Sequence, residues 1–256
     1  MNERFRRTRE FEDAMARGAS THLAEVDVGT LYVNAELPGV WDRNFLRLDE
    51  RAGDRSAAEL VKLADDLLGA AGVKHRKMYI AAEHASIEML DEFASLGWTR
   101  TDLATMAYGG QRLPPSDHVI EEVGASEYSP FEALCVDASP ASEASVKEQL
   151  VSLVPLMARV GRSRFFLARQ DGEAASGCHL YSDGEIAQVE DVMTLEPFRR
   201  RGLAGAVVSR AVESALQEGH SLVFLIVENE TGPKRLYENL GFEDIGQTVE
   251  LMLEPG

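Results

Sequence analysis

Cysteine, long apolar runs and positive charge are all scarce in this sequence, and each scarcity excludes a class of protein. The 256 residues include only 2 cysteines, Cys135 and Cys178, too few for a disulfide framework or a cysteine-rich metal cluster. The longest uninterrupted apolar run, Leu222 to Val227, is far too short to span a bilayer. The N-terminal segment 1–18 has arginines but lacks the apolar stretch of a secretory signal. We therefore expect a cytoplasmic protein that does not enter the membrane.

The shortage of positive charge restricts the partners. There are 26 lysines and arginines against 43 aspartates and glutamates, a formal net charge of −17. Such an acidic chain is poorly suited to bind nucleic acid or an anionic membrane surface. With 45% hydrophobic and 27% charged residues, the composition is that of a globular protein with a sizeable core. We expect an enzyme or a small-ligand-binding protein.

Apolar periodicity and turn residues predict alternating strands and helices along the whole chain. The predicted strands lie at 30–34, 41–48, 77–82, 101–108, 164–169, 177–181, 188–195, 222–227 and 248–253. The predicted helices lie at 57–70, 85–95, 143–158, 203–218 and 233–239. The segment 109–116 has two glycines and two consecutive prolines, so it is the best candidate for a linker.

The two halves align with each other at a fixed offset of 144 residues. Leu96-Gly97-Trp98 falls on Leu240-Gly241-Phe242, and one strand and two helices of each half fall in register without a gap. Any two α/β halves can be aligned somewhere, but four elements in register favour a duplication into tandem units. The predicted domains are residues 1–115 and 116–256.

The sharpest local pattern is Arg199-Arg200-Arg201-Gly202-Leu203-Ala204, between a predicted strand and a predicted helix. The first N–H groups of a helix lack intrahelical partners and point outward at the positive end of its dipole. A glycine lets an anion approach the backbone closely, and the arginines add charge for a diphosphate. The pattern predicts an anion site, with a helix start that merely exposes a basic cluster as the alternative.

This pattern, after a strand that ends in Leu195-Glu-Pro197, resembles the acetyl-CoA motif of the GNAT superfamily of N-acetyltransferases. The stretch from Arg235 to Phe242 (Arg-Leu-Tyr-Glu-Asn-Leu-Gly-Phe), preceded by Asn229, is similar to the closing motif of the family. The resemblance covers residues 120–253 well and the first half faintly. It implies an α+β fold of two GNAT-like units, each a mixed, mostly antiparallel sheet flanked by helices.

The resemblance also implies a path for acetyl-CoA, the expected co-substrate. The backbone of Met193 and Leu195 would pair with the pantetheine arm, and Asn229 would contact the cofactor where two central strands diverge. The amides of the turn and the first helical residues would hold the pyrophosphate; these residues are Arg200, Arg201, Gly202, Leu203, Ala204 and Gly205.

Two residues are the candidate catalytic groups. A protonated amine must lose a proton before it attacks a thioester, and Glu190 is the candidate base, since Val189–Val192 resembles a strand of glucosamine-phosphate acetyltransferases. In a regular strand Asp191 would point to the opposite face, a solvated carboxylate is the alternative for Glu190, and Glu185 is a weaker candidate. By the resemblance, Tyr237 would donate a proton to the departing thiolate, with an aromatic that packs a helix as its alternative.

The first half lacks this chemistry at the aligned positions. Tyr237 falls on Phe93, Gly202 on Ala58, Ala204 on Leu60 and Asn229 on Ala85, and Glu59 adds negative charge beside the aligned turn. We interpret it as a degenerate copy that builds the acceptor side of the cleft or the interface between halves. The six histidines have no ligand-like spacing, so no metal site is expected, and Cys178 is assigned to the core.

The predicted function is transfer of an acetyl group from acetyl-CoA to a primary amine, on a small molecule or a peptide, by direct attack. The acidic composition favours a cationic acceptor. An acyl-CoA-binding sensor or scaffold is the alternative, and a nucleotide-phosphate site is disfavoured because no Lys-Ser/Thr follows the glycine. Assembly into a homodimer stays open.

Overall fold

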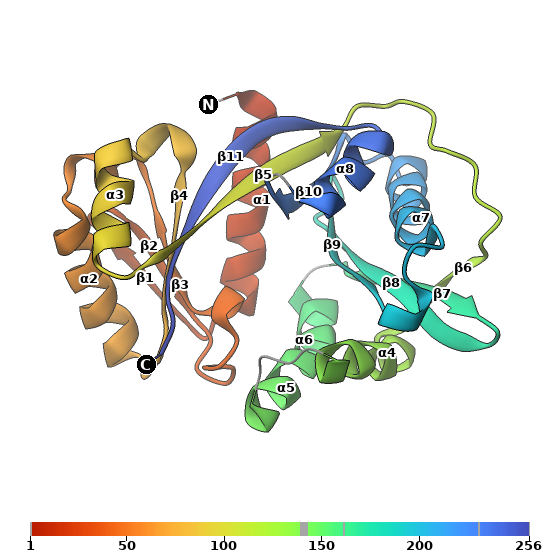
Figure 1. Cartoon of the computed structure of the whole chain (residues 1–256), viewed down its shortest axis with the longest axis horizontal. Helices are drawn as coiled ribbons and strands as arrows, with labels where there is room; N and C mark the ends of the chain where they lie inside the picture. Colours follow the sequence, from red (N-terminus) through yellow and green to blue (C-terminus); the bar gives the residue numbers. More distant parts are fainter. Residues whose placement is uncertain (1, 139–142, 161, 230, 256) are drawn as a thin grey trace.

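A single mixed sheet organises the chain in a computed structural model (Figure 1), which describes residues 2–138, 143–160, 162–229 and 231–255. Over these residues the sheet has 11 strands in the order β1-β2-β3-β4-β11-β5-β10-β9-β8-β7-β6. Only the pairs β3–β4 and β9–β10 are parallel. The predicted α+β class, a mostly antiparallel sheet flanked by helices, is confirmed.

The N-terminal half begins with a long helix and supplies three helices and five strands of the described chain. Its helices are α1 (Glu3–Ala19), α2 (Ala57–Ala70) and α3 (Ile87–Ser95). Its strands are β1 (His22–Val26), β2 (Gly29–Val33), β3 (Phe45–Leu48), β4 (Arg76–Ala81) and β5 (Thr99–Tyr108). Helices α2 and α3 pack on one face, and α1 lies on the other, toward the second half (Figure 1).

The C-terminal half has the same plan with more helices. Its helices are α4 (Ala125–Ala138), α5 (Ala144–Val151), α6 (Leu153–Val160), α7 (Leu203–Gln217) and α8 (Gly232–Asn239). Its strands are β6 (Ile120–Val123), β7 (Arg164–Gln170), β8 (Glu173–Ser182), β9 (Ile186–Thr194), β10 (Leu222–Glu228) and β11 (Phe242–Leu253). Helices α7 and α8 cover one face of these strands, and α4 and α6 cover the other.

The last strand of each half is exchanged with the other half. β11 lies between β4 and β5, and β5 lies between β11 and β10, so the two strands cross at the centre of the molecule (Figure 1). Their register is symmetric: the 144-residue offset carries Leu103 to Gln247 and Ala104 to Thr248, and Leu103 pairs with Thr248 while Ala104 pairs with Gln247. This crosswise pairing is what a pseudo-two-fold axis between two copies produces. The proposed domain boundary after residue 115 falls in the strand-free segment between β5 and β6, and it stays a prediction.

Helix α1 packs against the seam between the halves. Phe11 meets Phe224 edge-on with ring centroids 5.6 Å apart, and Phe5 lies on β11 over Gly246. A Cβ at Gly246 would come within 2.3 Å of the Phe5 ring, so only glycine lets the helix approach this closely. None of the helices within the described ranges is both long enough and apolar enough to cross a bilayer.

Several predicted elements differ in detail. The strand predicted at 41–48 begins as a 3₁₀ turn, η1 (Trp41–Arg43), and becomes β3 only from Phe45. The single helix predicted at 143–158 is two helices, because Pro155 has no N–H to donate back to Val151 and the chain restarts at Leu153. Helices α1 and α4 and strands β1 and β6 were not predicted.

Candidate active site

A gap opens in the sheet where the resemblance predicts one. β9 and β10 pair in parallel only over residues 186–188 and 222–224. Beyond this point β9 stays with β8, while β10 continues along β5 to the pair Glu228–Leu103. The two central strands therefore part over their C-terminal ends and leave backbone groups of β9 without a neighbouring strand.

The N-terminus of α7 lies at the end of β9, and its first turn is open. Gly202 is the N-cap residue with φ of +82°, and no side chain caps the helix. Arg200 also has a positive φ, of 65°, so the turn that presents these amides is held in a conformation that few side-chain-bearing residues adopt. His118, from the segment before β6, hydrogen-bonds the Arg201 carbonyl at 2.8 Å. The uncapped amides and the exposed arginines suit an anion.

The backbone register corrects the prediction for the pantetheine arm. The Leu195 N–H donates to the Ala175 carbonyl of β8 at 3.0 Å, so it does not face the gap. Because backbone direction alternates along a strand, Met193, which is paired with Gly177, also faces β8. The Thr194 carbonyl points the other way and accepts from Arg199 Nε at 3.2 Å. Thr194, and Val192 by the same alternation, are the residues on the open side.

Asn229 lies at the end of β10, as predicted, but its polar groups are engaged. Its N–H donates to the Asp102 carbonyl at 2.8 Å, and its Oδ1 accepts from Lys234 Nζ at 3.0 Å. Lys234 also pairs with Asp244 at 2.7 Å, which ties β10 to α8 and β11. A cofactor contact at Asn229 therefore stays a prediction.

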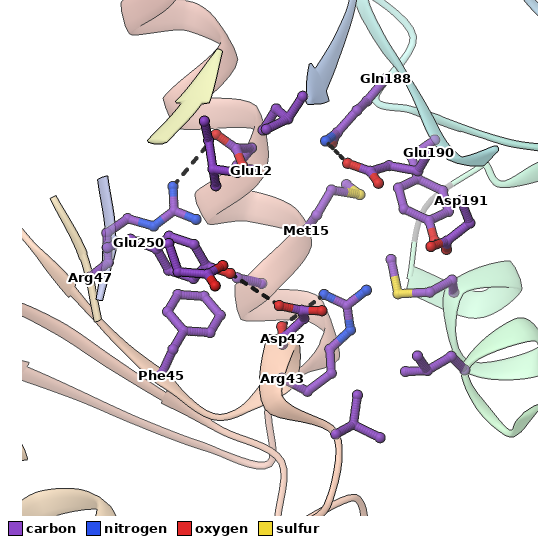
Figure 2. A pocket seen from close by; sticks show the side chains of 18 of the residues that line it. Glu12, Met15, Asp42, Arg43, Phe45, Arg47, Gln188, Glu190, Asp191 and Glu250 are labelled. Carbon is purple, nitrogen blue, oxygen red and sulfur yellow. Dashed lines mark hydrogen bonds and ion pairs between the residues drawn. The ribbon is translucent and has the colours of Figure 1, made fainter. Parts of the chain in front are cut away.

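A cavity of about 330 Å³ lies between the halves, on the sheet face that carries α1 and α6. One wall comes from the N-terminal half, with Asp42, Arg43 and Arg47, and the other from β9, with Gln188 and Glu190 (Figure 2). Apolar side chains complete it, among them Met15, Phe45, Leu103, Leu153, Met157 and Ile226. The degenerate half thus lines the cavity beside the predicted base.

Glu190 and Asp191 both line this cavity, against the expectation that they face opposite sides of the sheet (Figure 2). The reason is a bulge: Asp191 has φ of +50°, and the β8–β9 register shifts between Gly177 and His179. An extra residue in one strand turns consecutive side chains to the same face. Burial and the neighbouring Asp191 charge raise the pKa of Glu190 to about 8. A carboxyl with that pKa is a more effective base for an ammonium group than an ordinary glutamate.

The histidine next to the core cysteine contacts the Asp191 carboxylate of the cavity wall, a position that the sequence did not reveal. His179, on β8, is 1% exposed and lies between two carboxylates, 3.2 Å from Asp191 Oδ2 and 3.6 Å from Glu132 Oε2. Burial opposes its charge, but the two neighbouring carboxylates outweigh burial and raise its pKa to about 9. The Tyr181 hydroxyl joins the same cluster, at 3.1 Å from His179 Nδ1. His179 thus holds Asp191 at the cavity wall as an ion pair.

The N-terminal half has a matching cluster. Lys77, on β4, is buried and pairs with Asp42 and, at 2.9 Å, with Glu250. The Tyr79 hydroxyl donates to Asp42 at 3.0 Å. Burial along β4 does not alternate, since Lys77 and Met78 are both buried, so the sequence pattern gave no signal that this lysine is buried.

Tyr237, on α8, packs among the C-terminal core, with its ring 6.1 Å from that of Phe242. It is 7% exposed, and burial together with the charge of Glu190 raises the pKa of its phenol well above the usual range. The phenol is therefore protonated at neutral pH, which a general acid requires. Glu185 is elsewhere: it pairs with Arg7 at 2.7 Å on the surface and does not line the cavity. Cys178 is fully buried, and burial raises the pKa of its thiol, so its core assignment is confirmed.

Solved structures share this fold over almost the whole chain. A conserved Staphylococcus epidermidis protein described as functionally unknown has a TM-score of 0.73 and 13% identity, over 91% of this chain and 93% of its own. A GCN5-related N-acetyltransferase from Kribbella flavida has a TM-score of 0.64 and 21% identity, over 96% and 95%. A tandem GNAT protein from the clavulanic acid biosynthesis pathway has a TM-score of 0.60 and 16% identity, over 95% and 88%.

The fold is therefore that of the GNAT superfamily, and the predicted resemblance is confirmed. Residues 166–251, from β7 to β11, match the model of the family described as FR47-like protein. Proteins with curated descriptions include none that matches this sequence.

Proposed function

We propose that this protein transfers an acetyl group from acetyl-CoA to a primary amine by direct attack. One observation carries the proposal: β9 links two features. The uncapped N-terminus of α7 lies at the gap between β9 and β10, and Glu190, a residue of β9, lines the cavity. The GNAT fold supports acyl transfer in general, and the donor, the acceptor and the residue roles below belong to the proposal.

The donor would lie along the C-terminal half, residues 116–256. The amides of Arg200 to Gly205 would hold its pyrophosphate, because they are uncapped and lie at the positive end of α7. The backbone of Val192 and Thr194 would pair with the pantetheine arm. The acetyl group would then reach the cavity through the parted strands.

Two side chains would manage the protons. Glu190, directly or through water, would take a proton from the acceptor ammonium, and the free amine would attack the thioester carbonyl. As the carbon–sulfur bond breaks, the Tyr237 phenol would give its proton to the coenzyme A thiolate. The raised pKa values of both groups favour these roles, because Glu190 becomes a stronger base and Tyr237 keeps its proton.

Replacement of Tyr237 by phenylalanine separates a catalyst from an acyl-CoA sensor. We expect Tyr237→Phe to lower kcat for acetyl transfer by about 10²-fold while the Kd for acetyl-CoA stays unchanged. Release of the coenzyme A thiol in the presence of an amine panel measures the first quantity, and calorimetry measures the second.

Tyr108→Phe is the matched control, because the Tyr108 ring also packs on Phe242, with centroids 5.7 Å apart. Equal losses in both variants would make Tyr237 a packing residue. Wild-type binding of acetyl-CoA without turnover of any amine would favour the sensor.

A further inference from the structure

The charged groups that line the cavity mostly neutralise one another. Glu12 lies 3.8 Å from Arg47, and Asp42 and Glu250 share Lys77. Glu132 and Asp191 share His179. Each of these five carboxylates thus lies beside a cation of the protein itself, with three cations serving the five.

Glu190 and Arg43 are two of the charged residues of the cavity lining that lie outside these ion pairs. Glu190 accepts a hydrogen bond from the Gln188 amide and has no ion pair among the described residues. Arg43 also has no carboxylate partner within the described part of the chain, and its Nε is buried without a hydrogen bond. The cavity therefore has one unmatched acid and, facing it, an unmatched guanidinium.

Arg43 is held where a ligand can use it. It ends the turn η1, its carbonyl accepts from the Asn34 N–H at 3.1 Å, and its Nη1 donates to the Asp42 carbonyl at 3.1 Å. Figure 2 shows its guanidinium directed into the cavity from the N-terminal wall, with Glu190 and Asp191 on the opposite side. Its charge opposes the rise in the pKa of Glu190 and, after that of His179, contributes to the lowered pKa of Asp191.

From this unmatched pair we infer that the acceptor amine also carries an anionic group, a carboxylate or a phosphate, which binds Arg43 while the amine lies at Glu190. This inference rests on the proposed acetyl transfer and specifies its substrate class. A guanidinium binds either anion through two parallel hydrogen bonds, and a partly dry cavity strengthens them. The cavity volume of about 330 Å³ suits a small molecule. The acceptor is therefore an amino acid-like or amino phosphate-like compound, and a purely cationic polyamine is not expected.

Arg9 is the competing anchor, because it also lines the cavity without an ion pair among the described residues. It differs from Arg43 in its contacts, since its Nη1 donates to Thr248 Oγ1 at 3.3 Å. Burial and, after it, the charge of the neighbouring Arg47 lower the pKa of Arg9 to about 10. It lies on α1 and faces Arg47 and Glu12. Arg9→Met is therefore a matched control for Arg43→Met.

The test compares three acceptors of equal chain length: an ω-amino carboxylate, the corresponding ω-amino phosphate, and the alkylamine that lacks an anion. In the wild type we expect kcat/KM for one of the anionic acceptors to exceed that for the alkylamine by at least about tenfold. In Arg43→Met this ratio should fall to near one, in Arg43→Lys it should recover in part, and in Arg9→Met it should stay. The acceptor that shows the larger ratio identifies the carboxylate or the phosphate.

Binding without turnover gives a second measurement. Trp41 lies two residues before Arg43 on η1, and Trp98 is buried in the N-terminal core. Quenching of tryptophan fluorescence by the anionic acceptor, and its loss in Arg43→Lys or Arg43→Met, would report binding even where a variant loses turnover.

The outcomes separate the inference from the proposed function. Acetyl transfer with equal or better use of the alkylamine, or loss of the ratio in Arg9→Met and not in Arg43→Met, would overturn the Arg43 assignment and leave acetyl transfer standing. A wild type that does not bind acetyl-CoA would overturn both.

Discussion

Helices α2 and α7 occupy equivalent places in the two halves, but their N-termini have opposite chemistry. Ser56 caps α2 in a reciprocal box with Glu59, and Glu92 accepts the Ala57 N–H at 3.0 Å. Gly202 begins α7 with no capping side chain and follows a run of arginines. Since carboxylates already satisfy the amides of α2, that end rejects a phosphate, whereas α7 leaves the same kind of site open. The acids of the N-terminal half thus occupy the helix end that corresponds to the open end of α7.

The strands repeat this contrast. β3 has only 4 residues, and it ends two residues after it begins to pair with β4. β9 has 9 residues and continues past its pairing with β10. At β3 and β4 the described part of the N-terminal half therefore lacks the parted strands seen at β9 and β10, and its residues line one wall of the cavity instead. The following predictions test this division of labour.

The largest expected effect is at the base, which only the C-terminal half supplies. Glu190→Gln should lower kcat/KM by about 10²–10⁴-fold, because the neutral amide cannot take the ammonium proton. The wild-type profile should rise with pH as Glu190 ionises, through its pKa of about 8, and that rise should be absent in the variant. Acetyl transfer at a series of pH values measures both.

Glu185→Gln is the control for this prediction, since Glu185 lies outside the cavity. A loss of activity in Glu185→Gln with none in Glu190→Gln would reverse the assignment of the base.

The next effect distinguishes the two buried cations of the cavity walls. His179→Gln should lower the free energy of unfolding by about 3 kcal/mol, because Glu132 and Asp191 lose their shared cation. Since folding raises the pKa of His179 to about 9, this stabilisation is complete below pH 6.5 and is lost as the pH rises through 9. The difference in the free energy of unfolding between His179→Gln and the wild type should therefore become small at high pH. Urea unfolding at pH 6 and pH 9.5 measures it.

Lys77 shows the same direction of pH dependence in a higher pH range: against the effect of burial, Asp42 and Glu250 raise its pKa above the ordinary lysine value of 10.5, so its stabilisation is still complete at pH 9.5. The control for His179→Gln is His22→Gln, at an exposed position on β1, which should change the free energy of unfolding by less than about 0.5 kcal/mol. A His179→Gln deficit that is the same at both pH values would contradict the ion-pair account.

The smallest effect is at the closed helix end. The double variant Ser56→Ala/Glu59→Gln should cost about 1 kcal/mol of stability through the lost cap and should not create a second acetyl-CoA site. Thermal unfolding with and without acetyl-CoA measures both quantities. A second binding event in this variant would show that the cap alone keeps the N-terminal half empty.

Much of the fold could be predicted from local patterns. The helix predicted at 57–70 is α2 to the residue, and the glycine-terminated helices α3 and α8 lie within two residues of their predicted ranges. The 144-residue offset, which predicted tandem units, agrees with the symmetric register of β5 and β11, although the pairing of these two strands was not predicted. The exchange itself was beyond reach, because a strand pattern specifies a face and not a neighbour.

The candidate site divides in the same way. The turn from Arg200 to Gly205 was predictable, because its glycine, arginines and place before a helix are local features. The bulge at Asp191, the cavity residue Arg43, and the buried cations Lys77 and His179 behind the cavity carboxylates were not, because they become neighbours only through tertiary structure. The proposed pantetheine contacts moved from Met193 and Leu195 to Val192 and Thr194 because the Leu195 N–H points toward β8, which the sequence does not specify.

The central claim is that the N-terminus of α7 is open to a ligand and that of α2 is closed. Calorimetric titration with acetyl-CoA tests this claim most directly. The wild type should bind one acetyl-CoA per chain, and Gly202→Glu should abolish binding, since it places a carboxylate at the α7 amides as Glu59 does at α2. Gly72→Glu is the control: Gly72 has a similar φ of +76° at the far end of α2, with open space around it, and its variant should bind normally. Two acetyl-CoA per chain, or binding that survives Gly202→Glu, would contradict the account.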